Sequence, residues 1–187
     1  MNMRRLFFTA AIAGVLAAGG AWVISAPKSV DATEFANLTG DLAAGADVFR
    51  AAGCASCHSA PKSEGDQKLV LAGGRAFPSD FGTFYAPNIS PDISAGIGGW
   101  GLVDLANALR HGTSPEGRHY YPAFPYDAYS HMSAQDMASL SVYLANLPSS
   151  STPNRAHEVG FPFNIRRGLG FWKLLFVRDD WILPNAD

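Results

Sequence analysis

The chain has 187 residues, of which 48% are hydrophobic and only 16% are charged, and this composition excludes a long disordered polyelectrolyte. Its 14 basic and 16 acidic residues give a net charge of −2, so the chain lacks the basic excess that nucleic-acid binding needs. Since it contains 19 glycines and 12 prolines, we expect one domain of short helices joined by long loops.

The N-terminus predicts export from the cytoplasm. Arg4 and Arg5 precede an uncharged apolar run from Leu6 to Ile24. Such a run fits either a secretory signal that is cleaved before Ala26 or a retained helix long enough to span a membrane. Because the two arginines stay on the cytoplasmic side, both interpretations place the rest of the chain outside the cytoplasm. The length of the run favours the retained anchor.

Four segments are expected along the chain. Residues 1–26 form the signal peptide or anchor, and residues 27–40 are polar and read as a linker. Residues 41–150 form the folded domain, and residues 151–187 form a C-terminal extension. No internal repeat divides the domain further.

Helices are predicted where a capping residue precedes apolar residues at helical spacing. Asp41 caps a helix that reaches about Ala52, and Ser133 caps a second helix that Pro148 stops. Two more helices are expected, at Leu102–Arg110 and, within the aromatic tail from Phe161 to Trp181, near Ile165–Val177.

Between the helix that Asp41 caps and the helix at 102–110, the chain from Ser59 to Trp100 is rich in glycine and proline and shows no β alternation. It therefore predicts a long loop, which is unusual in a compact domain unless the loop wraps a group that is not protein.

The chemistry is carried by Cys54-Ala55-Ser56-Cys57-His58, a CxxCH motif. In an exported chain this motif predicts covalent attachment of a c-type haem. The two thiols reach the two vinyl groups on one edge of the porphyrin, and the histidine that follows brings an imidazole to the iron. A redox dithiol, half of a zinc site and an incidental disulfide are the competing interpretations. They are weaker because the chain has no thioredoxin-like pattern and no second cysteine pair.

The second axial position of the iron is either filled or open. A methionine ligand raises the reduction potential and suits electron transfer. Met137 lies in the apolar stripe of its helix, whereas Met132 lies in the loop before Ser133, where it can face the opposite side of the haem. Met132 is also spaced to form a hydrophobic staple with Met137. The rival ligands are His119 and His131, with His111 and His157 as weaker ones.

A family resemblance rests on several motifs beyond the CxxCH. They are the segments 86–92 (APNISPD), 96–100 (GIGGW), 119–126 (HYYPAFPY) and 161–167 (FPFNIRR). With these motifs, residues 41–178 resemble a class I cytochrome c, and in particular the cytochrome c subunits of periplasmic alcohol-type dehydrogenases. The resemblance implies an all-α class I cytochrome c fold whose long loops wrap one covalently bound haem c.

The chain departs from the family pattern in two places. Many relatives have methionine where this chain has Phe124. Others resemble this chain, with a methionine just before the last helix of the domain, which favours Met132 as the ligand. Many relatives continue into further haem domains, whereas this sequence has one CxxCH, so we expect a mono-haem protein or a truncated version of a longer one.

Three further residues are expected to contact the haem. Arg75 is a candidate charge partner for a propionate. Asn88 and Trp100 match the family pattern and are candidate propionate donors, although turn formation and core packing explain them equally well.

The function that the resemblance implies is electron transfer on the periplasmic side of the inner membrane. The donor would be a periplasmic dehydrogenase, and the acceptor an oxidase, another cytochrome or the quinone pool. The chain itself would not be an enzyme. Two rival hypotheses remain, a haem enzyme or gas sensor with an open iron and an assembly module of a larger dehydrogenase.

Overall fold

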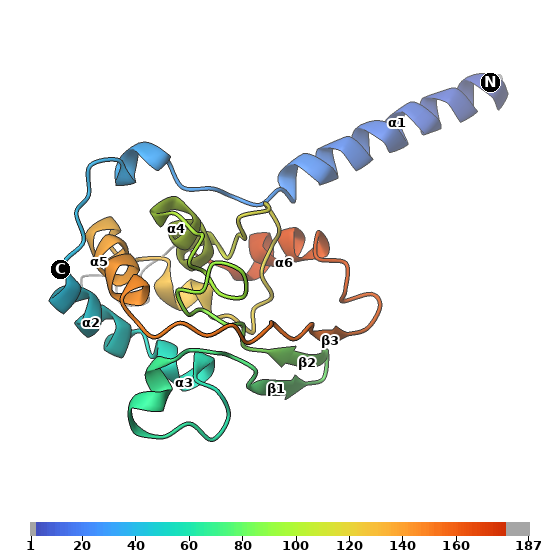
Figure 1. Ribbon diagram of the computed structural model, residues 1–187. Helices are drawn as coiled ribbons and strands as arrows, with labels where there is room; N and C mark the ends of the chain where they lie inside the picture. Colours follow the sequence, from blue (N-terminus) through green and yellow to red (C-terminus); the bar gives the residue numbers. More distant parts are fainter. Residues whose placement is uncertain (1–2, 179–187) are drawn as a thin grey trace.

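The computed structural model describes residues 3–178, in which short helices form the body and a small sheet lies at its edge (Figure 1). Helix α1 (Met3–Ile24) projects from the body, and helices α2 (Leu42–Ala51), α4 (Leu102–His111) and α5 (Ala134–Ala145) pack around the core. The short helix α3 (Cys54–His58) follows α2 directly, and α6 (Gly168–Phe176) lies beside the base of α1. This arrangement confirms the cytochrome c fold expected from the sequence.

The core helices begin at the predicted caps. The Asp41 carboxylate accepts a hydrogen bond from the Ala44 N–H at 2.7 Å, and the Ser133 hydroxyl accepts one from the Asp136 N–H at 3.0 Å. These bonds satisfy backbone donors that the first turn of a helix leaves unpaired. Helix α4 ends at Gly112, which has the left-handed conformation common after a C-terminus.

Helices α2 and α5 cross in close contact because glycine stands at the crossing. A Cβ on Gly45 would lie 2.1 Å from the carbonyl oxygen of Ser139, and one on Gly40 would lie 2.2 Å from that of Ala138. Side chains at these two positions would push the helices apart. Behind the crossing, the core is built from nine buried residues, Phe35, Phe49, Leu71, Leu105, Ala106, Leu109, Met137, Leu140 and Leu144.

Alanine at position 45 is therefore expected to destabilise the protein, even though alanine favours helix more than glycine does. Overpacking against a backbone carbonyl outweighs that gain, and we expect a net loss of about 2 kcal/mol or more in the free energy of unfolding. Chemical denaturation of Gly45→Ala measures it. Gly168→Ala in α6 is the matched control because nothing lies within 4 Å of that site, so unfolding should be unchanged or slightly delayed. Equal stability of the two variants would contradict the close crossing.

The expectation of an unstructured loop over residues 59–100 was wrong. This stretch contains a short 3₁₀ helix, η2 (Gly65–Leu69), and an antiparallel hairpin of β1 (Ala76–Ser79) and β2 (Gly82–Tyr85). Strand β2 also pairs with β3 (Glu158–Val159). Strand β1 shows no alternation because it is a mostly exposed edge strand that contains a proline, a position where sheets tolerate proline.

Two terminal segments differ in detail from expectation. Residues 27–40, expected as a linker, contain the 3₁₀ helix η1 (Ala32–Phe35) and place Phe35 in the core. The Glu34 carboxylate pairs there with Arg110 of α4 at 2.7 Å. In the tail, α6 begins three residues later than the predicted helix near 165–177, and Trp181 lies outside the described residues.

Candidate haem-binding site

Helix α3 presents the CxxCH motif on a single turn. Gly53 has a φ of 67°, a left-handed conformation that suits glycine, and it turns the chain sharply from α2 into α3. Cys54 and Cys57 then stand three residues apart on one helical face. The junction is held from the distal loop, because the Tyr129 hydroxyl donates to the carbonyl oxygen of Ala52 at 2.9 Å.

His58 is oriented by a backbone acceptor 29 residues away. Its Nδ1 lies 2.8 Å from the carbonyl oxygen of Pro87, so Nδ1–H donates and the Nε2 lone pair is left for a metal. Burial lowers the pKa of His58, which keeps the imidazole in the neutral form that ligates iron. The Gly73 N–H donates to the carbonyl oxygen of His58 at 2.7 Å and fixes the same residue from behind.

The geometry weakens the competing interpretations of the cysteines. Cys54 and Cys57 are not joined by a disulfide. Burial raises the pKa of the Cys54 thiol to about 11, whereas a redox-active dithiol needs a lowered pKa. Among residues 3–178, no group of three or more His, Cys, Asp and Glu side chains is placed to hold a metal ion such as zinc.

A cavity of about 220 Å³ opens beside the acceptor of His58. Its lining combines apolar residues, among them Pro87, Ile97, Trp100 and Tyr120, with the charged residues Glu116, Arg118 and Arg166. An apolar lining that also contains guanidinium groups fits a flat apolar macrocycle that carries two carboxylates. This lining fits the edge of a haem, and the cavity adjoins the CxxCH turn through Pro87, although Cys54, Cys57 and His58 do not themselves line it.

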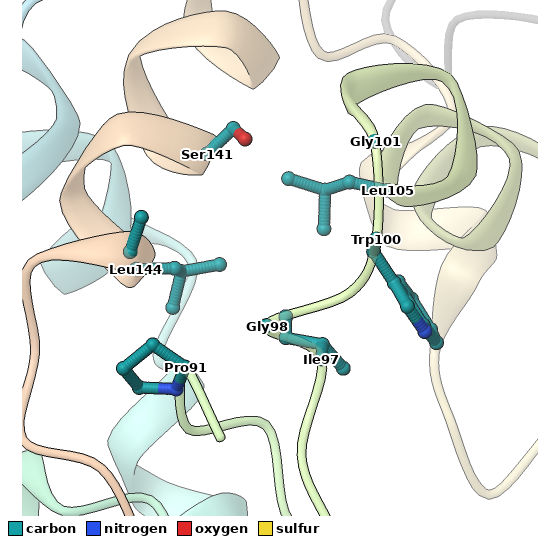
Figure 2. Close-up of a pocket in the computed structure, with 9 residues that line it drawn as sticks. Pro91, Ile97, Gly98, Trp100, Gly101, Leu105, Ser141 and Leu144 are labelled. Carbon is teal, nitrogen blue, oxygen red and sulfur yellow. The ribbon is translucent and has the colours of Figure 1, made fainter. Parts of the chain in front are cut away.

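A second, smaller cavity of about 60 Å³ separates α5 from the loop that enters α4. Figure 2 shows Leu105 pointing toward α5 across from Leu144, while Trp100 points away from α5. Ile97 and Trp100 line both cavities and form the wall between them. Contact of Trp100 with a haem stays a prediction.

The other two predicted contact residues lie differently. Asn88 is buried, and its amide donates to the carbonyl oxygens of Ser150 at 2.7 Å and Thr152 at 2.9 Å. Both amide hydrogens are thus used to hold the segment after α5, although Asn88 lines the cavity. The Arg75 side chain is exposed and is not among the residues that line the cavity. Direct haem contacts of Arg75 and Asn88 therefore gain no support from this geometry.

Arg118 and Arg166 line the cavity, whereas Arg75 does not. Arg166 also donates to the carbonyl oxygen of His119 at 3.2 Å, and its guanidinium lies over the Tyr121 ring. A signal for Arg118 was present in the sequence, because Arg118 and Tyr120 alternate around His119 in an extended stretch. Arg166 carried no such signal, since it reaches the cavity from the C-terminal extension.

Among the rival distal ligands, His119 points away from the cavity that its neighbours Arg118 and Tyr120 line. Its Nε2 lies 2.9 Å from the carbonyl oxygen of Ser25 at the base of α1. The Nδ1 atom of His157 accepts the Tyr85 N–H at 3.1 Å, and its ring packs against Phe84. The imidazoles of His119 and His157 are thus engaged elsewhere. His111 ends α4, and His131 is exposed.

Met132 follows Tyr129, which bonds the junction between α2 and the CxxCH helix. It packs against the same core cluster as Cys54, and its N–H donates to the carbonyl oxygen of Tyr129, the residue that bonds Ala52. The Met132 carbonyl oxygen accepts a hydrogen bond from Arg110 at 3.4 Å. This bond uses a backbone atom and does not involve the thioether. Ligation of the iron by Met132 stays a prediction.

A CxxCH turn whose imidazole is oriented by a backbone acceptor is typical of a c-type haem protein. In agreement, the family model for cytochrome c matches residues 42–148, and the chain belongs to the cytochrome c family.

Its relatives include cytochromes that work with dehydrogenases. The chain is 52% identical over 185 residues to a "Diheme cytochrome c-type" protein of Cereibacter sphaeroides, covering 98% of this chain and 62% of that protein. It is 40% identical over 125 residues to the fructose dehydrogenase cytochrome subunit of Gluconobacter japonicus, covering 66% of this chain and 25% of that subunit. It is 32% identical over 141 residues to the cytochrome c subunit of the quinone alcohol dehydrogenase of Gluconobacter oxydans, covering 75% and 28%. The chain therefore spans less than two thirds of the length of these relatives.

Proposed function

We propose that this chain carries single electrons through one covalently attached haem c. The donor is a periplasmic dehydrogenase, and the acceptor is an oxidase, another cytochrome or the quinone pool. The observation that carries the proposal is the hydrogen bond from His58 to the carbonyl oxygen of Pro87, because it leaves one imidazole nitrogen ready for iron directly after the two cysteines.

The haem, when bound, supplies a one-electron couple at its iron. The residues of this chain bind and surround it. Cys54 and Cys57 would attach it, His58 and Met132 would ligate its iron, and Trp100 would pack against it. Arg118 and Arg166 would offset the charge of its propionates.

The names of the relatives support the choice of partner. Cytochrome subunits of fructose, alcohol and gluconate dehydrogenases are among the relatives of this chain.

We place the protein on the periplasmic side of the inner membrane, with α1 as an anchor. This helix has 22 residues, is about 33 Å long at 1.5 Å per residue, and is therefore long enough to cross a bilayer.

The test is the absorption spectrum and haem content of the membrane-extracted protein. We expect one haem per chain that survives denaturation and extraction, a low-spin ferric spectrum, and no carbon monoxide binding after reduction. A high-spin iron that binds carbon monoxide would overturn electron transfer in favour of a haem enzyme or gas sensor. Haem that extracts freely would overturn covalent attachment. A haem that accepts electrons only within an isolated dehydrogenase complex would indicate an assembly module.

A further inference from the structure

Helix α6 has its charged side chain inside and its apolar side chains outside. The Lys173 ammonium donates inward to the carbonyl oxygens of His111 at 2.6 Å and Gly112 at 2.9 Å, and it lies over the Tyr126 ring. The outer stripe is apolar and exposed, with Leu174 at 55% and Leu175 at 72% exposure beside Phe171. A helix on the surface of a soluble domain shows the opposite pattern, so this face is built to meet something apolar.

The N-terminal half of α6 is fastened to the base of α1. Ser25 is only 1% exposed, and a Cβ on Gly170 would lie 2.2 Å from its carbonyl oxygen. The same oxygen accepts the bond from His119, and the Arg167 Nε donates to the Ser25 hydroxyl at 3.1 Å. Figure 1 shows α6 directly beside the point where α1 leaves the body. The apolar stripe is therefore held at one end of the candidate membrane span.

The groups around this junction suit the boundary between lipid and water. Trp22 is exposed in the last turn of α1, and the Arg167 guanidinium lies 4.1 Å from its ring centroid. Tryptophan is enriched at the level of lipid headgroups. Arg178 stands exposed just beyond the other end of α6. Cations at both ends of an apolar stripe match the anionic headgroups of a bilayer.

We propose that α6 lies in the interfacial layer of the membrane that α1 crosses, with its outer stripe of Phe171, Leu174 and Leu175 buried among the lipids. A docking protein is the other class of occupant for an apolar face. The bilayer is favoured because the stripe is fixed to α1, and a retained α1 brings the bilayer to this face without any further component. The proposal rests on retention of α1, as proposed above, and is independent of the haem.

The experiment uses spin labels on the full-length protein in vesicles of phosphatidylethanolamine and phosphatidylglycerol. One label is placed at Leu175→Cys. The matched position is Ile93→Cys, an apolar residue that is 82% exposed in the loop before α4. We expect the label at position 175 to be accessible to oxygen and at least fivefold less accessible than the label at 93 to a water-soluble paramagnetic reagent. The control is protein denatured in detergent-free buffer, in which the two labels should be equally accessible to the water-soluble reagent.

A second pair of variants tests the junction. Gly170→Ala places a Cβ against Ser25 and should expose the label at position 175 to the aqueous reagent, whereas Gly168→Ala has open space and should preserve protection. Equal aqueous accessibility at 175 and 93 would overturn the proposal, and so would protection at 175 that appears only when a dehydrogenase is added. An intact mass starting near Ala26 would overturn it through loss of α1. If the chain without an introduced cysteine took up the spin label, Cys54 and Cys57 would be free. That result would contradict the haem assignment and would leave the position of α6 to the accessibility measurement.

Discussion

Leucine in place of Met132 is expected to abolish the weak red charge-transfer band of the ferric protein and to lower its midpoint potential by on the order of 100 mV or more. The thioether stabilises reduced iron, and leucine removes the sulfur while it keeps nearly the same volume. Exchange of methionine and leucine usually costs less than about 1.5 kcal/mol in stability, so the fold should survive. Ferric absorption spectra and a redox titration of purified Met132→Leu measure the two effects.

Met137→Leu is the matched control. Met137 is fully buried in α5 and belongs to the core cluster with Leu140. The same exchange there should leave the band and the potential unchanged. If Met132→Leu kept the band and the potential, Met132 would not be the ligand. If the unmodified protein had a low-spin spectrum without the band, His131 would become the next candidate. A band lost in Met137→Leu alone would contradict the assignment most directly.

The helices of the domain could be predicted because their signals are local. Asp41 and Ser133 cap their helices within the next three residues, and Gly112 ends α4 through its own backbone conformation. The hairpin of β1 and β2 was missed because β1 is a mostly exposed edge strand without alternation, and the pairing of β2 with β3 was missed because β3 lies more than 70 residues later. The crossing of α2 and α5 was equally hidden, since Gly45 reads as a poor helix former until Ser139 is seen opposite it.

The candidate site likewise has a part that the local sequence predicts and a part that depends on residues far apart in the chain. Cys54, Cys57 and His58 are adjacent in sequence, so the motif alone identifies them. The acceptor of His58 is the carbonyl oxygen of Pro87, a backbone atom that no residue pattern marks. Asn88 resembles a ligand-binding amide in sequence, yet its hydrogen bonds go to the segment after α5, which only the folded chain brings near.

A side chain at Gly73 would collide with the peptide that orients His58. Its φ is 73°, and a Cβ there would lie 2.5 Å from the carbonyl carbon of Pro87 and 2.6 Å from its oxygen. That oxygen is the acceptor that orients His58. Gly73→Ala is therefore expected to lower the free energy of unfolding by about 3 kcal/mol or more, from left-handed strain of about 1–2 kcal/mol together with the clash. Because Pro87 must move, the ferric spectrum and the midpoint potential should change as well.

Gly74→Ala separates the two causes. Gly74 also has a left-handed φ, 86°, but the nearest atom to its Cβ would be the Pro61 Cδ at an ordinary 3.9 Å. This variant should lose only the strain energy of about 1–2 kcal/mol and keep the spectrum and potential of the unmodified protein. Denaturation curves and redox titrations of both variants make the comparison. A Gly74→Ala protein as damaged as Gly73→Ala would mean that backbone strain alone governs this turn. A Gly73→Ala protein with an unchanged potential would mean that the Pro87 carbonyl does not set the electronic state of the His58 imidazole.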